Sequence, residues 1–183
     1  MPVFATPAPH LKFPAVERSS AKSTATGFFP TAPGMTPVHI TKVTVTGNEA
    51  VVAFENGHIE STAMNGELVL RRFDFGWQTV AVRAPGIHPP ACTADSGDPA
   101  AVTAVRRELL SHQQEAIGPV VVQSGYALVH WWGNGGGEDA YEHRGTEWHR
   151  ISGGGGTLTA RELESSGVPN AIAERLFTLQ TKC

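Results

Sequence analysis

Two stretches of this chain alternate short apolar runs with glycine-containing turns, and this pattern restricts the fold more than any other feature. The first stretch covers residues 38–83 and turns at Gly47-Asn48, and the second covers residues 120–151 and turns at Gly125. Short runs rich in β-branched residues on either side of such turns are typical of β-hairpins. Each stretch therefore predicts an antiparallel β-meander.

The two predicted meanders can be aligned with each other. The alignment pairs Gly47 with Gly125, Ala50 with Ala127, Val52 with Val129, Val69 with Tyr141 and Trp77 with Trp148. Alternation of strand residues produces some matches by chance, but a tryptophan after the second turn of both stretches is harder to obtain in this way. We interpret the two meanders as an internal duplication.

Helical patterns flank the second meander. Asp98 followed by Pro99 is a typical helix start, and apolar residues recur at three- and four-residue steps from Val102 to Ala116. The tail from Thr157 predicts two short helices. The expected fold class is α+β, with two related antiparallel β-meanders and helices packed on one face.

The N-terminal residues have a different composition. Residues 1–37 are rich in proline, serine, threonine and alanine and show neither a helical nor a strand period, which predicts an extended or flexible Pro-rich arm. If this arm docks on a partner, its aromatic anchors are Phe13, Phe28 and Phe29. The chain then divides into the arm (1–37), the first meander with its connecting loop (38–97), and the helix, second meander and C-terminal helices (98–183).

Charge and hydropathy exclude several classes of partner. The chain has 14 Lys and Arg against 17 Asp and Glu, a net charge of −3, and so lacks the basic field that binds nucleic acid. It has no run of about 18 apolar residues, so we expect no membrane insertion. No signal peptide is visible, which favours a cytoplasmic location, or a periplasmic one if the chain is a mature product.

The two cysteines are Cys92, in a Pro-rich loop, and Cys183, the last residue. Two cysteines are too few for a disulfide framework or a cysteine zinc site. They could form one disulfide or remain two thiols, and their spacing decides neither.

Part of the second half carries a distinctive series of motifs: Gly125-Tyr126-Ala127, Gly136-Gly137, Trp148, Gly153 to Gly156, Leu163 and Gly167-Val168-Pro169. With these motifs, residues 102–176 resemble a poorly characterised family of small bacterial copper-uptake-system-associated proteins. The resemblance implies a helix, then strands, then a further helix in chain order, and an association with copper. Some members have a cysteine before the glycine run, where this chain has Ser152, so the resemblance supports no thiolate ligand here.

Three histidines of the second meander, His130, His143 and His149, are the candidate metal ligands. Imidazole is a good ligand for copper and zinc. We expect no cofactor, and copper or zinc is the alternative. Their spacing matches no local metal motif, and strand alternation sets Tyr141 and His143 on one face and Glu142 on the other. The competing interpretation is that they are solvated surface residues.

The same meander contains candidate binding residues. Gly135, Gly136 and Gly137 could present backbone N–H groups to an anion, or could serve turns and close chain contacts. Trp131, Trp132 and Tyr141 could stack on a flat ligand, although alternation turns the two neighbouring tryptophans to opposite faces.

None of the motifs that identify a nucleophile and its base is present in this sequence. The sequence therefore favours a non-enzymatic accessory or binding protein that contacts another protein. A metal-binding accessory protein of a copper-handling pathway is the first alternative, and an enzyme with a small pocket is the second.

Overall fold

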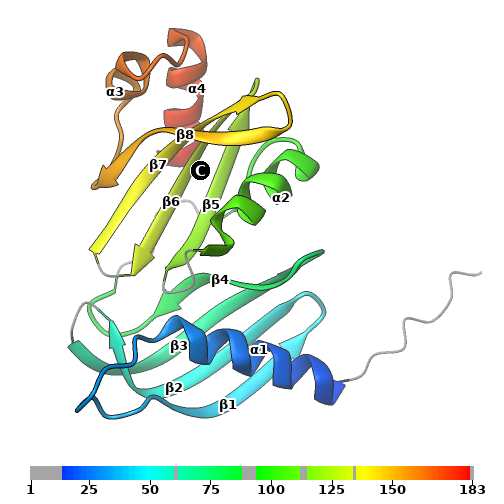
Figure 1. Ribbon diagram of the computed structural model, residues 1–183, viewed down its shortest axis with the longest axis vertical. Coiled ribbons are helices and arrows are strands. Elements are labelled where there is room, and N and C mark those ends of the chain that lie inside the picture. Colours follow the sequence, from blue (N-terminus) through cyan, green and yellow to red (C-terminus); the bar gives the residue numbers. More distant parts are fainter. Residues whose placement is uncertain (1–13, 60–61, 88–93, 112–114, 134, 182–183) are drawn as a thin grey trace, which may run out of the picture.

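The computed structural model describes residues 14–59, 62–87, 94–111, 115–133 and 135–181 (Figure 1). Within these residues it contains two four-stranded antiparallel sheets and four α-helices, which confirms the α+β class. The two cysteines lie outside the described residues. No helix in the described part of the chain has the length and apolar character needed to cross a membrane.

The first unit is a helix followed by a four-stranded meander. Its elements are α1 (Pro14–Phe28), β1 (His39–Thr46), β2 (Glu49–Ile59), β3 (Thr62–Phe73) and β4 (Gly76–Arg83). The strands pair in chain order, and α1 lies across one face of the sheet (Figure 1).

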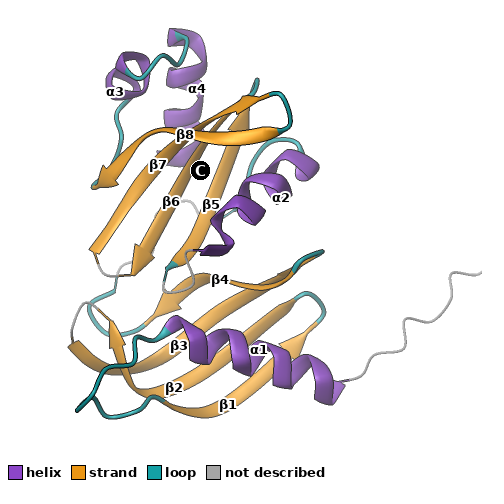
Figure 2. Ribbon diagram, viewed as in Figure 1, coloured by secondary structure: helices purple, strands orange, loops and turns teal. Residues whose placement is uncertain are grey.

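The second unit repeats this order and adds two helices. Its elements are α2 (Pro99–Glu108), a 3₁₀ turn η1 (Leu109–Ser111), β5 (Ala116–Gln123), β6 (Tyr126–Gly133), β7 (Gly135–Arg144), β8 (Glu147–Gly155), α3 (Ala160–Ser165) and α4 (Asn170–Thr181). The four strands again pair in chain order. Both units are therefore a helix followed by a meander, as Figure 2 shows in purple and orange.

Helix α1 lies within the segment that the sequence analysis expects to be an extended arm. Ala21, Ala25 and Phe28 follow a helical spacing and are buried on the first sheet, and the Phe29 ring packs on Phe54 with 4.7 Å between centroids. Phe28 and Phe29 are thus core residues and not anchors for a partner, whereas Phe13 lies outside the described residues. The helix was missed because alanines, which carry little hydropathy signal, form much of its buried face.

Helix α2 is shorter than its sequence pattern. Asp98 caps it as predicted, by accepting a hydrogen bond from the Ala101 N–H at 2.9 Å, but the helix ends at Glu108. Ala116, assigned to the helical pattern, is already in β5 and pairs with Trp132. An apolar residue fits either element, and here the pairing with β6 decides its structure.

The helices of the second unit do not share one face of the sheet, which differs from the expectation. Val102, Val105 and Leu109 pack with α2 against one face, whereas Leu163 and Leu176 pack with α3 and α4 against the other. Strand β5 is accordingly buried on both sides along nearly its whole length. This second sheet is a middle layer between helices, while α1 is the helix that packs on the first sheet.

The strand register shows how similar the two units are. Equivalent positions form the pairs Ala50–Leu70 and Arg72–Trp77 in the first unit, and Ala127–Tyr141 and His143–Trp148 in the second. The two tryptophans correspond, as predicted. Leu70 is the equivalent of Tyr141, however, so the alignment of Val69 with Tyr141 is wrong by one residue. Leu68, Val69 and Leu70 are all apolar, and such a run gives no alternation from which to fix the register.

The two units meet around a buried arginine of α2. Arg106 is 1% exposed, and its guanidinium donates to both carboxylate oxygens of Asp95 (2.6 and 3.2 Å), to the Gln78 side chain (2.9 Å) and to the Ile117 carbonyl (2.8 Å). Gln78 in turn donates to the Arg106 carbonyl at 3.1 Å. Burial lowers the pKa of Arg106 from its ordinary value, while the Asp95 carboxylate acts in the opposite direction. The interaction joins β4 of the first unit to α2 and β5 of the second.

Replacing Arg106 should therefore destabilise the protein much more than replacing its neighbour. We expect Arg106→Met to lower the free energy of unfolding by about 3 kcal/mol, because it leaves Gln78 and the Ile117 carbonyl without their partner. Arg107 pairs with Asp74 at the surface, so Arg107→Met should cost less than about 1 kcal/mol. Urea denaturation followed by tryptophan fluorescence measures the stability of both variants. Equal losses of stability would contradict the role of Arg106 in joining the two units.

Candidate functional site

The three candidate metal ligands lie on two faces of the second sheet. Alternation along β7 places Glu138 and Glu142 on one face and His143 on the other. His130 pairs with Glu138 and His149 with Glu142, so these two histidines share the face opposite to His143. In the described part of the chain no three His, Cys, Asp or Glu side chains group as a metal site requires.

Each of these histidines has local contacts of its own. The His130 Nδ1 atom lies 3.4 Å from the buried Glu138 carboxylate, and the His149 Nε2 atom lies 3.8 Å from Glu147. His143 packs against Trp148 with 5.0 Å between ring centroids. Of the three, only His143 lies on the side of the sheet that α2 covers.

The glycine runs belong to strands β7 and β8 and are not free loops. The Gly156 N–H donates to the Gly136 carbonyl at 3.0 Å. A Cβ atom at Gly137 would lie 2.0 Å from the Gly154 carbonyl oxygen, and one at Gly153 would lie 1.9 Å from the Asp139 carboxylate. The runs allow a close approach of chain to chain, which supports the structural interpretation over an anion cradle.

The candidate aromatic residues are divided between the two faces, as alternation predicts. Trp131 and Tyr141 pack on the α2 side. Trp132 packs with Ala116 into the core of the first unit, so it contributes to the contact between units. The α2 side also holds Trp148, and this is where the structure brings aromatic residues together.

A groove opens beside the N-terminal half of α2. It has a volume of about 560 Å³, and its lining residues are Gly97, Asp98, Ala100, Ala101, Ala104, Val122, Gln123, Ser124, Gly125, His143 and Trp148. The small side chains of α2 form one wall, and the β5–β6 turn with the His143–Trp148 pair forms the other. Ser124 has a φ of +49°, an uncommon conformation for a residue with a side chain.

A polar row lies next to the His143–Trp148 pair on the same face. The Arg150 guanidinium donates to Asp139 at 2.7 Å, although Asp139 is only 2% exposed. Burial, and then the Asp139 charge, raises the pKa of Tyr141 above its ordinary value. Sequence reasoning missed this row because Asp139 and Arg150 are brought together only by the pairing of β7 with β8.

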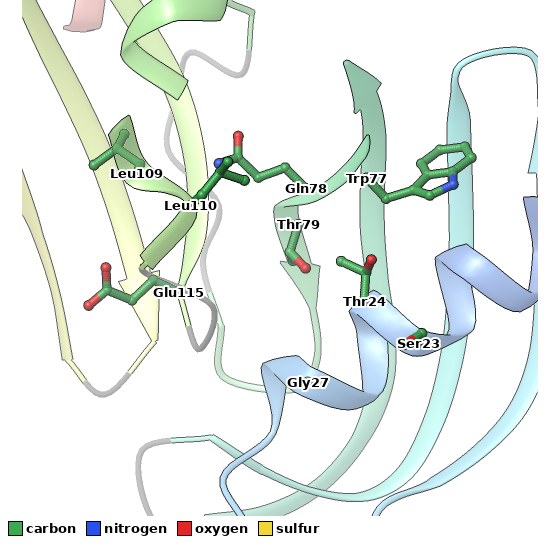
Figure 3. Close-up of a pocket in the computed structure, with 9 residues that line it drawn as sticks. All are labelled: Ser23, Thr24, Gly27, Trp77, Gln78, Thr79, Leu109, Leu110 and Glu115. Carbon is green, nitrogen blue, oxygen red and sulfur yellow. The ribbon is translucent and has the colours of Figure 1, made fainter. Parts of the chain in front are cut away.

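A second cavity of about 280 Å³ lies between the two units (Figure 3). Its lining residues are Ser23, Thr24 and Gly27 of α1, Trp77, Gln78 and Thr79 of β4, and Leu109, Leu110 and Glu115 of the second unit. Sequence reasoning could not find this cavity, because α1 falls within the predicted arm. The only available signal was the helical spacing of Ala21, Ala25 and Phe28.

Alanine substitutions at two neighbouring glycines test whether the glycine run has a structural role. Gly153→Ala should lower the free energy of unfolding by about 2 kcal/mol, because its φ of +152° and the contact with Asp139 both oppose a side chain. Gly154 has nothing within 4 Å of an added Cβ atom, so Gly154→Ala should change stability by less than about 1 kcal/mol. Thermal and urea denaturation compare them, and similar losses would contradict this role.

The positions of the histidines also give a prediction for metal binding. Because His143 faces away from His130 and His149, we expect the triple His→Ala variant to bind Cu²⁺ and Zn²⁺ as weakly as the parent chain does. Isothermal titration of tag-free protein measures this. A submicromolar site that is present in the parent and lost in the triple variant would contradict it.

Comparisons of the chain with protein-family models, with curated proteins and with solved structures found no match. The resemblance of residues 102–176 to copper-uptake-system-associated proteins is therefore neither supported nor contradicted by them. The groove beside α2 and the cavity between the units are the features on which a function can be argued.

Proposed function

We propose that this protein is a non-enzymatic binding protein that holds a segment of another protein in the groove beside α2. The groove, with the His143–Trp148 aromatic pair in one wall and small α2 side chains in the other, is the observation that carries the proposal. Its volume of about 560 Å³ accommodates several side chains of a peptide. Aromatic residues in such a position are frequent anchors of protein interfaces.

The α2 wall of the groove is anchored to the sheet in the unbound chain. Ser96 forms a parallel bridge to β5, with its N–H donating to the Val120 carbonyl at 3.0 Å and its carbonyl accepting from the Val122 N–H at 2.8 Å. A Cβ atom at Gly97 would lie 2.4 Å from the Val122 carbonyl oxygen, so the segment leading into α2 lies directly on the sheet. A groove with rigid walls loses little conformational entropy on binding, which favours affinity.

The chemistry of the groove fits a peptide better than a reacting substrate. The Asp98 carboxylate already caps α2. The Gln123–Ser124 turn offers polar groups at one end, and the alanines leave room for apolar side chains. By comparison, the division of the three histidines between two faces gives the copper-binding alternative less support.

The test uses peptides selected on the purified full chain. Random peptides displayed on phage are selected for binding to the parent protein, and individual peptides are then measured with a groove-blocked variant, Ala100→Trp. Ala100 is exposed in the wall of the groove, so the larger side chain should occupy the groove without disturbing the core. We expect selected peptides to lose at least tenfold in affinity.

Ala15→Trp is the matched control, because Ala15 is an exposed alanine of α1 on the other unit. It should leave peptide affinity unchanged. His143→Ala should weaken binding by about fivefold, in line with the contribution of one aromatic contact. Peptides that bind the parent and Ala100→Trp equally well, or a selection that yields no binder, would overturn the proposal.

A further inference from the structure

The turn between β5 and β6 forms one end of the groove, and its backbone conformation is unusual. Ser124 has a φ of +49°, in the left-handed region that favours glycine. Among the described residues, Asn56 is the other non-glycine residue with a positive φ. Asparagine enters this region more readily than serine does, so Ser124 is the less expected of the two. A serine side chain at this position has a conformational cost.

The first unit has the same two-residue turn with a glycine at this position. The last pairs before the two turns are Thr46–Glu49 and Gln123–Tyr126. This register matches Gly47 with Ser124, so the alignment of Gly47 with Gly125 is wrong by one residue. Gly47 has a φ of +60°, so the backbone has the same conformation at both positions. Gly47 lines neither of the two cavities described above, whereas Ser124 lines the groove.

The Ser124 side chain is hydrogen-bonded to its neighbour Gln123. The Gln123 Nε2 atom donates to the Ser124 Oγ atom at 3.1 Å, and both residues line the groove. A serine hydroxyl can accept and donate at the same time. Neither the Ser124 hydroxyl proton nor the Gln123 Oε1 atom has a partner in the described part of the chain. The end of the groove therefore offers one donor and one acceptor on adjacent residues.

An adjacent donor and acceptor match the main chain of an extended peptide. In an extended strand, the N–H and C=O groups of one residue point to the same side and exchange two hydrogen bonds with a neighbouring strand. The Ser124 hydroxyl and the Gln123 Oε1 atom together can replace that neighbour. The remaining walls, with the His143–Trp148 pair and the alanines of α2, then receive a side chain of the same peptide.

From these observations we infer that Ser124 and Gln123 bind the main chain of an extended peptide. The Ser124 hydroxyl donates to a peptide carbonyl, and the Gln123 Oε1 atom accepts from a peptide N–H. The inference rests on the proposed function of the groove, and it names the conformation of the segment that the groove holds. Its main support is the serine itself, because the same turn has a glycine where no groove is present. Unfavourable backbone conformations are concentrated at binding and active sites.

The test replaces the turn residue in the full chain and measures, by fluorescence anisotropy, the affinity of peptides selected on the parent protein. Ser124→Ala removes the hydroxyl and should weaken binding about fivefold, the effect of one hydrogen bond. Ser124→Gly should weaken binding to the same extent and raise the Tm by about 3 °C, because glycine adopts the left-handed conformation without cost. A serine with only a structural role would give neither loss of affinity.

Gly47→Ser makes the reverse change in the turn of the first unit. It should lower the Tm and leave peptide affinity unchanged, because this turn lies outside the groove. Methylation of the peptide N–H groups, one residue at a time, tests main-chain recognition directly. Methylation at one position should weaken binding to the parent about fivefold and have no such effect on Gln123→Ala, which has already lost the acceptor.

The outcomes separate this inference from the proposed function. Peptides that bind Ser124→Ala as tightly as the parent, but are still excluded by Ala100→Trp, would overturn the inference and leave the proposed function standing. The same conclusion follows if no methylated position distinguishes the parent from Gln123→Ala. A selection that yields no binder would overturn both.

Discussion

The guanidinium of Arg106 forms hydrogen bonds with three parts of the molecule. It joins β4 of the first sheet, through Gln78, to β5 of the second, through the Ile117 carbonyl, and to the connecting segment, through Asp95. Asp95 also accepts from Arg71 of β3 and from the Val120 N–H. A charge at this depth is costly to bury unless nearly every donor is satisfied, so the geometry of its partners is tightly constrained. This network, together with the packing of Trp132 into the core of the first unit, holds the two sheets in their relative position.

Both cavities depend on the same junction. Helix α2, which carries Arg106, packs against the second sheet. Its small residues lie opposite His143 and Trp148 and form the groove with them. At the smaller cavity, the lining residue Gln78 of β4 is held by its hydrogen bonds with Arg106. One buried residue thus positions surfaces on both sides of α2, although it lines neither cavity itself.

The strands could be read from the sequence because their signal is local, whereas the sites could not. Turn pairs such as Gly47-Asn48 and the alternation around Ala127 marked the hairpins, and Asp98-Pro99 marked the start of α2. Helix α1 stayed hidden because its buried residues include small alanines, and with it the cavity residues Ser23 and Thr24 were missed. The predicted metal site combined three histidines that are close in sequence. In the structure His143 faces α2 while His130 and His149 face away, and this division is set by the pairing of the strands.

The two units place different residues on the same framework. Beneath α1, two positions of β3 hold Leu68 and Leu70; beneath α2, the equivalent positions of β7 hold Asp139 and Tyr141, with Arg150 of β8 beside them. Leucine at such positions stabilises a sheet at no electrostatic cost, whereas a buried carboxylate requires a paired arginine and a glycine to make room for it. The same framework therefore accommodates either apolar or paired charged side chains at these positions. If the groove binds a peptide as we propose, this polar row lies next to the bound segment.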